Sequence, residues 1–150
     1  MARRRVCAAG ESHLRQATGW FHVDRIASLA RDNTSFSDGG WILAYDSAGA
    51  LKYRVAGKTY STGRTTGSLL GGWHHVVLTK NGGDVAFYID GALVHTGTGA
   101  PNTAASAPWH VMRNGTYYTY SSGVADEIAI YSSALSAATV KQHFDAGRGS

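Results

Sequence analysis

The sequence predicts an all-β protein in which two antiparallel sheets pack face to face, with one short helix near the C-terminus. The main observation is the stretch 71–97, where three runs of strand-forming residues are separated by two tight-turn signals. Composition agrees, because 19 glycines and only 2 prolines in 150 residues suit a fold with many turns. Three strands alone cannot bury this much apolar surface, so a second sheet is expected on one of their faces.

Each part of this stretch follows from its residue types. Residues 73–79 are dense in aromatic and β-branched side chains, which fit a pleated surface better than a helix. Asparagine and glycine at 80–83 tolerate the positive φ of a hairpin turn. Over 85–90 the side chains alternate between two faces. Asp90-Gly91 is a two-residue hairpin signal that leads into a third strand at 92–96.

Similar patterns predict strands elsewhere in the chain. In 51–55 every second residue is apolar, so Leu51, Tyr53 and Val55 are expected to face the core. This strand is expected to form a hairpin with 41–45. The further strands are predicted at 20–23, 27–31 and 109–112.

Two tryptophans and two polar stretches complete the predicted sandwich. Trp41 and Trp73 stand in strong strand patterns and are predicted core residues. Residues 57–72 are rich in glycine, serine and threonine, which predicts a loop with at most one short strand. Residues 114–122 predict a loop or a short hairpin.

One helix is predicted at the C-terminal end. Ser136 suits the N-cap position, and Leu135 with Val140 forms a hydrophobic staple. Val140 and Phe144 share a helix face, and Gly147 stands where a C′ glycine is expected. The helix is expected to cover one end of the sandwich.

The positive charge is concentrated at the N-terminus. The chain has a formal net charge of +4, yet residues 32–150 hold equal numbers of basic and acidic side chains. The body of the predicted domain, residues 32–150, is therefore neutral, which argues against a nucleic-acid-binding face.

Residues 1–17 show no clear periodicity and are expected to be a tail or a truncated first strand, with the sandwich domain at 18–150. The first residues lack the apolar stretch of a signal peptide, and no segment approaches the roughly 20 apolar residues of a membrane span. Cys7 is the single cysteine, so no internal disulfide is expected.

Two sequence blocks resemble a known family. The runs GWHHVVLT at 72–79, NGG at 81–83 and VAFYIDGALV at 85–94 resemble the central signature of concanavalin A-like, laminin-G-like jelly-roll domains. A second block, GVADEIAIYSSALS at 123–136, resembles the closing strand of the family and the short helix after it. The resemblance extends over about residues 20–147 and implies a concanavalin A-like two-sheet jelly roll.

The opening strand that is usual in this family is not recognisable here. In the family that strand pairs beside the closing strand. Its absence would leave the edge of residues 125–131 open, which predicts self-association or a missing flanking segment.

The sequence does not predict a catalytic site. Glycosidases of this fold place carboxylates on one strand as Glu-x-Asp-x-x-Glu, and that motif is missing. Asp126 and Glu127 are adjacent on a predicted strand, so their side chains should point to opposite faces. His74 and His75 fail as a metal pair for the same reason, since zinc ligands must converge. Nucleotide-binding and acyl-transfer motifs are also missing.

Aromatic residues in predicted loops are candidates for carbohydrate binding. Tyrosine and tryptophan offer an apolar ring face with a polar tip, which suits stacking on a sugar. The alternative is that these rings fill the ends of the sandwich as core residues. The candidates are Tyr117, Tyr118, Tyr120, Trp109 and Tyr60.

The family resemblance also implies a candidate calcium ligand. Many domains of this fold bind calcium through aspartates and backbone carbonyls, and the aspartate that matches Asp126 often takes part. The partner ligands from the N-terminal loop are not visible in this sequence. Asp126 is alternatively explained as a cap of the turn after Gly123.

The expected function is that of a non-catalytic binding module in a larger secreted, surface or virion protein. Its ligand would be a carbohydrate or a protein surface, bound through loops at the rim of the sandwich. One alternative is a structural or oligomerisation module without a small ligand. A less favoured alternative is a glycoside hydrolase.

Overall fold

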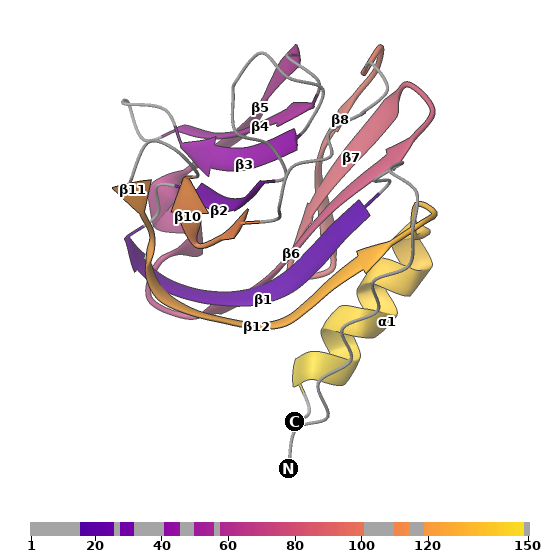
Figure 1. Ribbon diagram of the computed structural model, residues 1–150. Coiled ribbons are helices and arrows are strands. Elements are labelled where there is room, and N and C mark those ends of the chain that lie inside the picture. Colours follow the sequence, from indigo (N-terminus) through magenta and orange to yellow (C-terminus); the bar gives the residue numbers. More distant parts are fainter. Residues whose placement is uncertain are drawn as a thin grey trace.

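The computed structural model describes residues 16–25, 28–31, 41–45, 50–55, 58–100, 110–114 and 119–148. In these residues, two five-stranded antiparallel sheets face each other across the core, which confirms the predicted all-β sandwich (Figure 1). A two-stranded sheet and one α-helix complete the described part. The elements are β1 Gln16–Arg25, β2 Ser28–Arg31, β3 Trp41–Tyr45, β4 Ala50–Val55, β5 Lys58–Thr65, a 3-10 turn Thr66–Leu69, β6 Trp73–Asn81, β7 Asp84–Ile89, β8 Ala92–Gly97, β9 His110–Val111, β10 Arg113–Asn114, β11 Thr119–Tyr120, β12 Ser122–Tyr131 and α1 Ala137–Arg148.

The first sheet has the strand order β12-β1-β6-β7-β8. β1 pairs with β12 on one side and with β6 on the other. An opening strand therefore does lie beside the closing strand, and the expectation that residues 125–131 lack this neighbour is wrong. The strand begins at Gln16, ahead of the residue-18 domain boundary expected from sequence. Small and polar residues before Gly19 give it a weak strand signal, while pairing on both sides supplies its hydrogen bonds.

The three-strand meander is confirmed with both of its turns. β6 and β7 are joined by two residues, with Asn81 paired to Asp84. β7 and β8 are joined by Asp90 and Gly91, whose φ values are 53° and 74°. Positive φ at both central residues is what a type I′ turn requires, and this turn matches the twist of the flanking strands.

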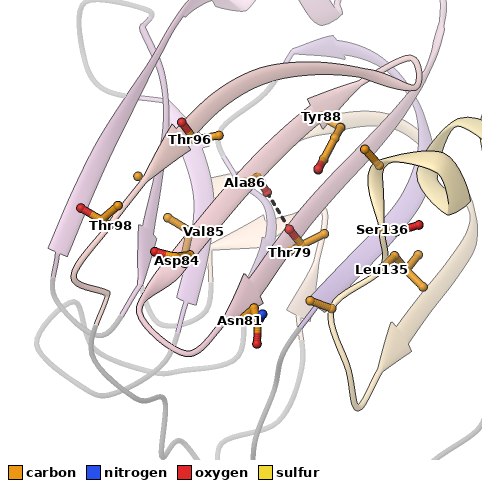
Figure 2. A pocket seen from close by; sticks show the side chains of 13 residues that line it. Thr79, Asn81, Asp84, Val85, Ala86, Tyr88, Thr96, Thr98, Leu135 and Ser136 are labelled. Carbon is orange, nitrogen blue, oxygen red and sulfur yellow. Dashed lines mark hydrogen bonds between the residues drawn. The ribbon is translucent and has the colours of Figure 1, made fainter.

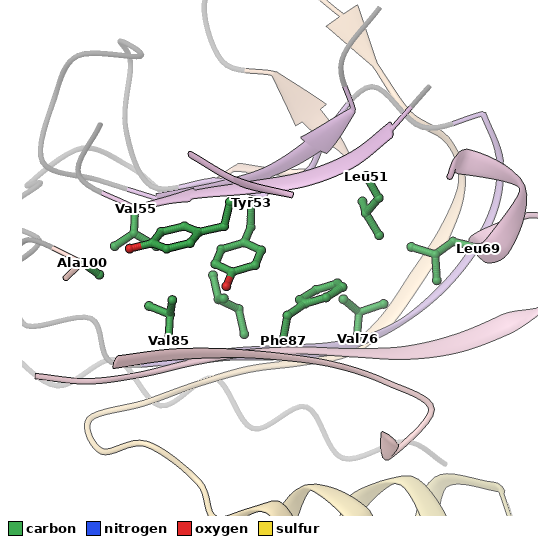
Figure 3. Close-up of a cluster of buried hydrophobic side chains, with 10 residues drawn as sticks. Leu51, Tyr53, Val55, Leu69, Val76, Val85, Phe87 and Ala100 are labelled. Atoms are coloured by element: carbon green, nitrogen blue, oxygen red, sulfur yellow. The ribbon is translucent and has the colours of Figure 1, made fainter. Parts of the chain in front are cut away.

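The second sheet has the order β5-β4-β3-β2-β9 and supplies one side of the core. Leu51 and Tyr53 are 0% exposed and Val55 is 1% exposed, as the alternation in β4 predicts. Figure 3 shows these side chains meeting Val85 and Phe87 from the opposite sheet. The interior is thus formed by one face of each sheet.

Residues 58–69 differ from the predicted loop. They form the eight-residue strand β5, paired with β4, followed by a 3-10 turn. Threonine, serine and glycine hide the strand because only Tyr60 and Thr62 on it are buried. The Thr62 hydroxyl donates to the carbonyl of Leu51 at 2.7 Å, so even this polar position is satisfied inside.

Gly97 lies where β8 passes close to the core, and we expect Gly97→Ala to destabilise the protein by about 1–3 kcal/mol through overpacking. An added Cβ would overlap ring carbons of Tyr60 and lie 3.2 Å from Val85. The Tyr60 ring cannot easily move, because it stacks on Tyr53 at 4.9 Å. Urea unfolding would measure the loss. The control is Gly83→Ala, whose Cβ would have no neighbour nearer than 3.6 Å; equal losses in the two variants would refute the overlap.

α1 packs on the outer face of the first sheet, and the expectation that it covers one end of the sandwich is wrong (Figure 3). Val140 is fully buried against Val77 and Tyr88, with Leu135 packed alongside as the staple predicts. The middle of β6, around Val77, is therefore covered on both faces.

The start of α1 agrees with the sequence prediction, whereas its end does not. Ser136 is the N-cap, as predicted, because its Oγ accepts a hydrogen bond from the Thr139 N–H at 3.1 Å. The C-terminal expectation is off by two residues, since Gly147 lies inside the helix and Arg148 ends it. Among the described residues, no helix combines the length and apolar character needed to cross a membrane.

Trp73 is not a core residue. Its side chain is 48% exposed, although it opens β6, where residues 75–80 are buried. Trp73 alternates onto the same face as His75 and Val77, and α1 covers those two residues. Trp73 lies outside the part of this face that α1 covers. The side chain of Trp41 is outside the described residues.

Candidate functional site

Four of the aromatic candidates stand within or next to β9, β10 and β11 in the sequence. Trp109 immediately precedes β9, while Tyr117 and Tyr118 fall in the connection between β10 and β11; all three are outside the described residues. Tyr120 lies on β11, where its backbone pairs with Arg113. β9 pairs with β2, and the carbonyl of Met112 accepts the Ser121 N–H at 2.8 Å. These contacts place β10 and β11 next to β9, which is an edge strand of the second sheet.

Tyr60 is separate from those segments and is buried, with 7% exposure. Its ring is stacked on Tyr53, and its hydroxyl donates to the carbonyl of Thr98 at 3.1 Å. The ring face is therefore covered by protein and is not offered to a ligand.

Asp126 and Glu127 lie at a β-bulge in β12, where the register with β1 shifts between Thr18 and Trp20. Glu127 has a φ of 50°, a left-handed value that is uncommon for a residue with a side chain. Asp126 is exposed, and its Oδ1 accepts the Glu127 N–H at 2.8 Å. This contact braces the backbone of β12 at the bulge.

Asp126 has no metal-binding cluster around it in the part of the chain that the structure describes. Those residues contain no group of three or more His, Cys, Asp or Glu side chains able to hold a metal ion. One exposed carboxylate does not match the six to eight oxygen ligands that calcium takes. We therefore derive no role for calcium from these residues.

His74 and His75 lie on opposite faces of β6, as their adjacency predicts. His74 Nδ1 is 2.8 Å from Asp90 Oδ2, and the backbone N–H of His75 donates to Asp90 Oδ1 at 2.9 Å. The His75 ring is 2% exposed and stacks on Phe144 of α1, with ring centres 6.3 Å apart. Burial and then His143 lower the pKa of His75 to about 4, while Asp90 opposes the shift. His74 thus contacts the Asp90 carboxylate and His75 contacts Phe144, so both side chains have a structural role.

A groove of about 550 Å³ opens on the outer face of the first sheet, beside the start of α1 (Figure 2). β6, β7 and β8 form its floor where they approach the 81–84 turn, and the segment 134–137 forms a wall. Its volume falls within the range of small-ligand sites, which is roughly 300–1,000 Å³.

The lining of this groove combines polar and apolar groups. Asp84 provides a carboxylate and Asn81 an amide, and both side chains are exposed. The Tyr88 ring is buried under α1, but its hydroxyl faces the groove in Figure 2. Further hydroxyl groups in the lining belong to Thr79, Thr96, Thr98 and Ser136.

The sequence pattern does not predict this groove. The polar residues at alternate positions of β6 and β8 look like a solvated sheet face, which is what period 2 normally indicates. A groove forms only because α1 starts on that face and raises a wall beside it. The signal available in the sequence was the cluster of outward threonines, but it does not reveal where the helix begins.

Residues 15–141 match the Concanavalin A-like lectin/glucanases superfamily, which is most of the chain. The chain belongs to this superfamily. The match starts at the residue before β1 and covers every described strand, so the two-sheet arrangement is the concanavalin A-like jelly roll. None of the curated proteins matches the chain.

Solved structures of the same fold share few identical residues with this superfamily member. Domain 4 of an extracellular GH43 arabinanase from Geobacillus stearothermophilus, in complex with arabinotriose, has a TM-score of 0.71 at 20% identity, over 89% of this chain and 67% of that one. The CBM40 of the Ruminococcus gnavus IT-sialidase, bound to α2,3-sialyllactose, has a TM-score of 0.59 at 17% identity, over 88% and 83%. A heptameric SAP-like pentraxin from Limulus polyphemus has 0.60 at 16%, over 85% and 69%. At such identities the likeness establishes the fold alone.

Proposed function

We propose that this chain is a non-catalytic carbohydrate-binding module. The observation that carries the proposal is the pairing of β10 with β11, which brackets two predicted sugar-stacking tyrosines in a member of a lectin superfamily. Two proteins of the same fold were solved with arabinotriose and with sialyllactose bound, which supports a saccharide as the ligand class.

The proposed binding surface is the edge formed by β9, β10 and β11. Tyr117 and Tyr118 stand in the sequence between these two paired strands, in the segment that we call the hairpin tip, and Trp109 immediately precedes β9. We propose that these three aromatic residues contact the sugar. Stacking of successive rings on sugar faces is the expected mode of binding, because aromatic rings offer apolar faces at low entropic cost.

The carboxylates of Asp126 and Glu127 support a binding role over hydrolysis. A retaining glycosidase needs two carboxyl groups about 5 Å apart and an inverting one about 6.5–9.5 Å apart, on either side of the bond that is cleaved. Asp126 instead holds the backbone of Glu127 at the bulge of β12. We infer that the acidic pair shapes the strand. Polysaccharide cleavage that is abolished by Glu127→Gln would overturn this assignment.

The combined change Tyr117→Ala and Tyr118→Ala is expected to weaken glycan binding by roughly 1–3 kcal/mol, the range seen when stacking aromatics are removed from other sites. A glycan array followed by titration calorimetry on the best ligand would measure the loss. Trp73→Ala is the control, because Trp73 is an exposed aromatic on a different sheet. Equal affinities for the double variant and the wild type would reject the hairpin tip as the binding surface.

A structural or oligomerisation module is the second candidate function. The free edge of β12 favours it, since no other strand of the described residues pairs there, and Val124 and Ile130 on this strand are 57% and 38% exposed. Absence of glycan binding together with a stable oligomer in sedimentation would select this candidate. For either function, we propose that this domain is part of a larger secreted or surface protein, because one structural relative is a domain of an extracellular enzyme.

A further inference from the structure

We propose that the groove beside the start of α1 is a second carbohydrate-binding site, which recognises a saccharide by hydrogen bonds to its hydroxyl groups. The ligand class rests on the proposed function, whereas the location is new. The groove lies on the outer face of the first sheet, and β10 and β11 lie on the far side of the molecule from the start of α1 (Figure 1).

The groove offers both donors and acceptors of hydrogen bonds. Sugar hydroxyls both donate and accept, so they need a site that offers both roles. The Asp84 carboxylate accepts, the Asn81 amide does both, and the Tyr88 and threonine hydroxyls do both. Within the described residues, the side chains of Asn81, Asp84 and Thr96 make no hydrogen bond of their own, so they remain available to a ligand.

The same lining also has an apolar part. Ala86, Leu135 and Ala137 place methyl and methylene groups between the polar ones. A sugar presents C–H groups between its hydroxyls, and a mixed lining of this kind matches it. Among the described residues that line the groove, the one aromatic ring is that of Tyr88, which is 7% exposed under α1 and offers no open face. Recognition here would therefore depend on hydrogen bonds, in contrast to stacking at the hairpin tip.

Hydrogen bonds fix the walls of the groove before a ligand arrives. The Ala100 N–H donates to the carbonyl of Gly83 at 2.9 Å, which ties the end of β8 to the 82–83 turn. The Lys58 ammonium donates to the carbonyl of Thr98 at 2.6 Å. On the other wall, the N-cap of Ser136 fixes the start of α1. Such preorganisation reduces the entropic cost of binding.

Two sites on different sides of one domain would let it hold two chains, or two positions along one chain, of a polysaccharide. Linked sites raise the effective concentration of the second binding event, so the gain would appear only with long ligands. Short oligosaccharides would report each site separately.

The experiment is an amide chemical-shift titration of the full chain with arabinotriose, maltotriose and α2,3-sialyllactose. At least one of them is expected to shift Asn81, Thr96 and Ala137 in a saturable way. Thr96→Tyr should remove these shifts, because its ring would fill the groove. Thr59→Tyr is the matched control, an exposed strand threonine on β5, outside the groove. Asp84→Ala should raise the groove Kd about tenfold, the loss expected for one hydrogen bond to a charged group.

The outcomes separate this inference from the proposed function. Groove shifts that Thr96→Tyr removes, and that the change of Tyr117 and Tyr118 to alanine leaves intact, would establish the second site. Shifts confined to residues 109–120 would overturn the second site and leave the proposed function standing. Shifts confined to the groove would support the second site and overturn the hairpin tip as a binding surface. An absence of shifts with every saccharide would overturn both.

Discussion

Phe87→Ala is expected to lower the free energy of unfolding by about 3–5 kcal/mol, the usual loss when a buried phenylalanine is truncated in a close-packed core. Phe87 is 0% exposed and lies between the two sheets, where its ring stacks on Tyr53 at 5.7 Å (Figure 3). Tyr53 is itself fixed, because its hydroxyl is hydrogen-bonded to His95 Nδ1 at 3.0 Å. The core around the deletion cannot collapse easily, so a cavity should remain.

Urea unfolding of the two proteins would give this loss. The control is Phe144→Ala, which removes the same atoms from a half-buried site on the outer face of the sheet. It should cost less, because fewer contacts are lost and water can fill the space. If the two variants lose the same stability, the space between the sheets is not the main hydrophobic core.

Acid is expected to destabilise the protein through His75, by up to about 3 kcal/mol below pH 4. The pKa of His75 is lowered from 6.5 to about 4 by burial under α1, with a smaller contribution from His143. Above pH 6.5 this side chain is neutral in both states and stability is full. Between pH 6.5 and 4 the unfolded chain takes up a proton that the folded chain does not, so stability falls as the pH falls.

Unfolding free energies at pH 8 and pH 5 would test this linkage. The wild type should lose about 2 kcal/mol from His75 between these values, and His75→Leu should lose correspondingly less. His143→Leu should reduce the pH dependence only slightly, because His143 makes the smaller contribution to the lowered pKa of His75. An unchanged pH dependence in His75→Leu would show that the buried imidazole is not responsible.

The site was less predictable than the fold. Aromatic residues in loops could be chosen from composition, yet Tyr60 proved to be a core residue, because β5 is a strand that its threonines and serines conceal. Conversely, Trp73 was expected inside and lies half exposed. Both differences have one cause. Whether an aromatic ring is covered depends on what packs over its face, and alternation within one strand does not report that.

The sequence by itself determined the meander at 73–97, its two turns and the N-cap of α1, because these depend on contacts between residues close in the chain. Local hydrogen bonds and the steric demands of positive φ at Asp90 and Gly91 are sufficient to specify them. Only the tertiary structure decided that β1 pairs with β12 and that α1 lies on the outer face of the sheet. Those arrangements bury apolar faces from distant segments against each other, and the groove exists only where α1 begins on that face.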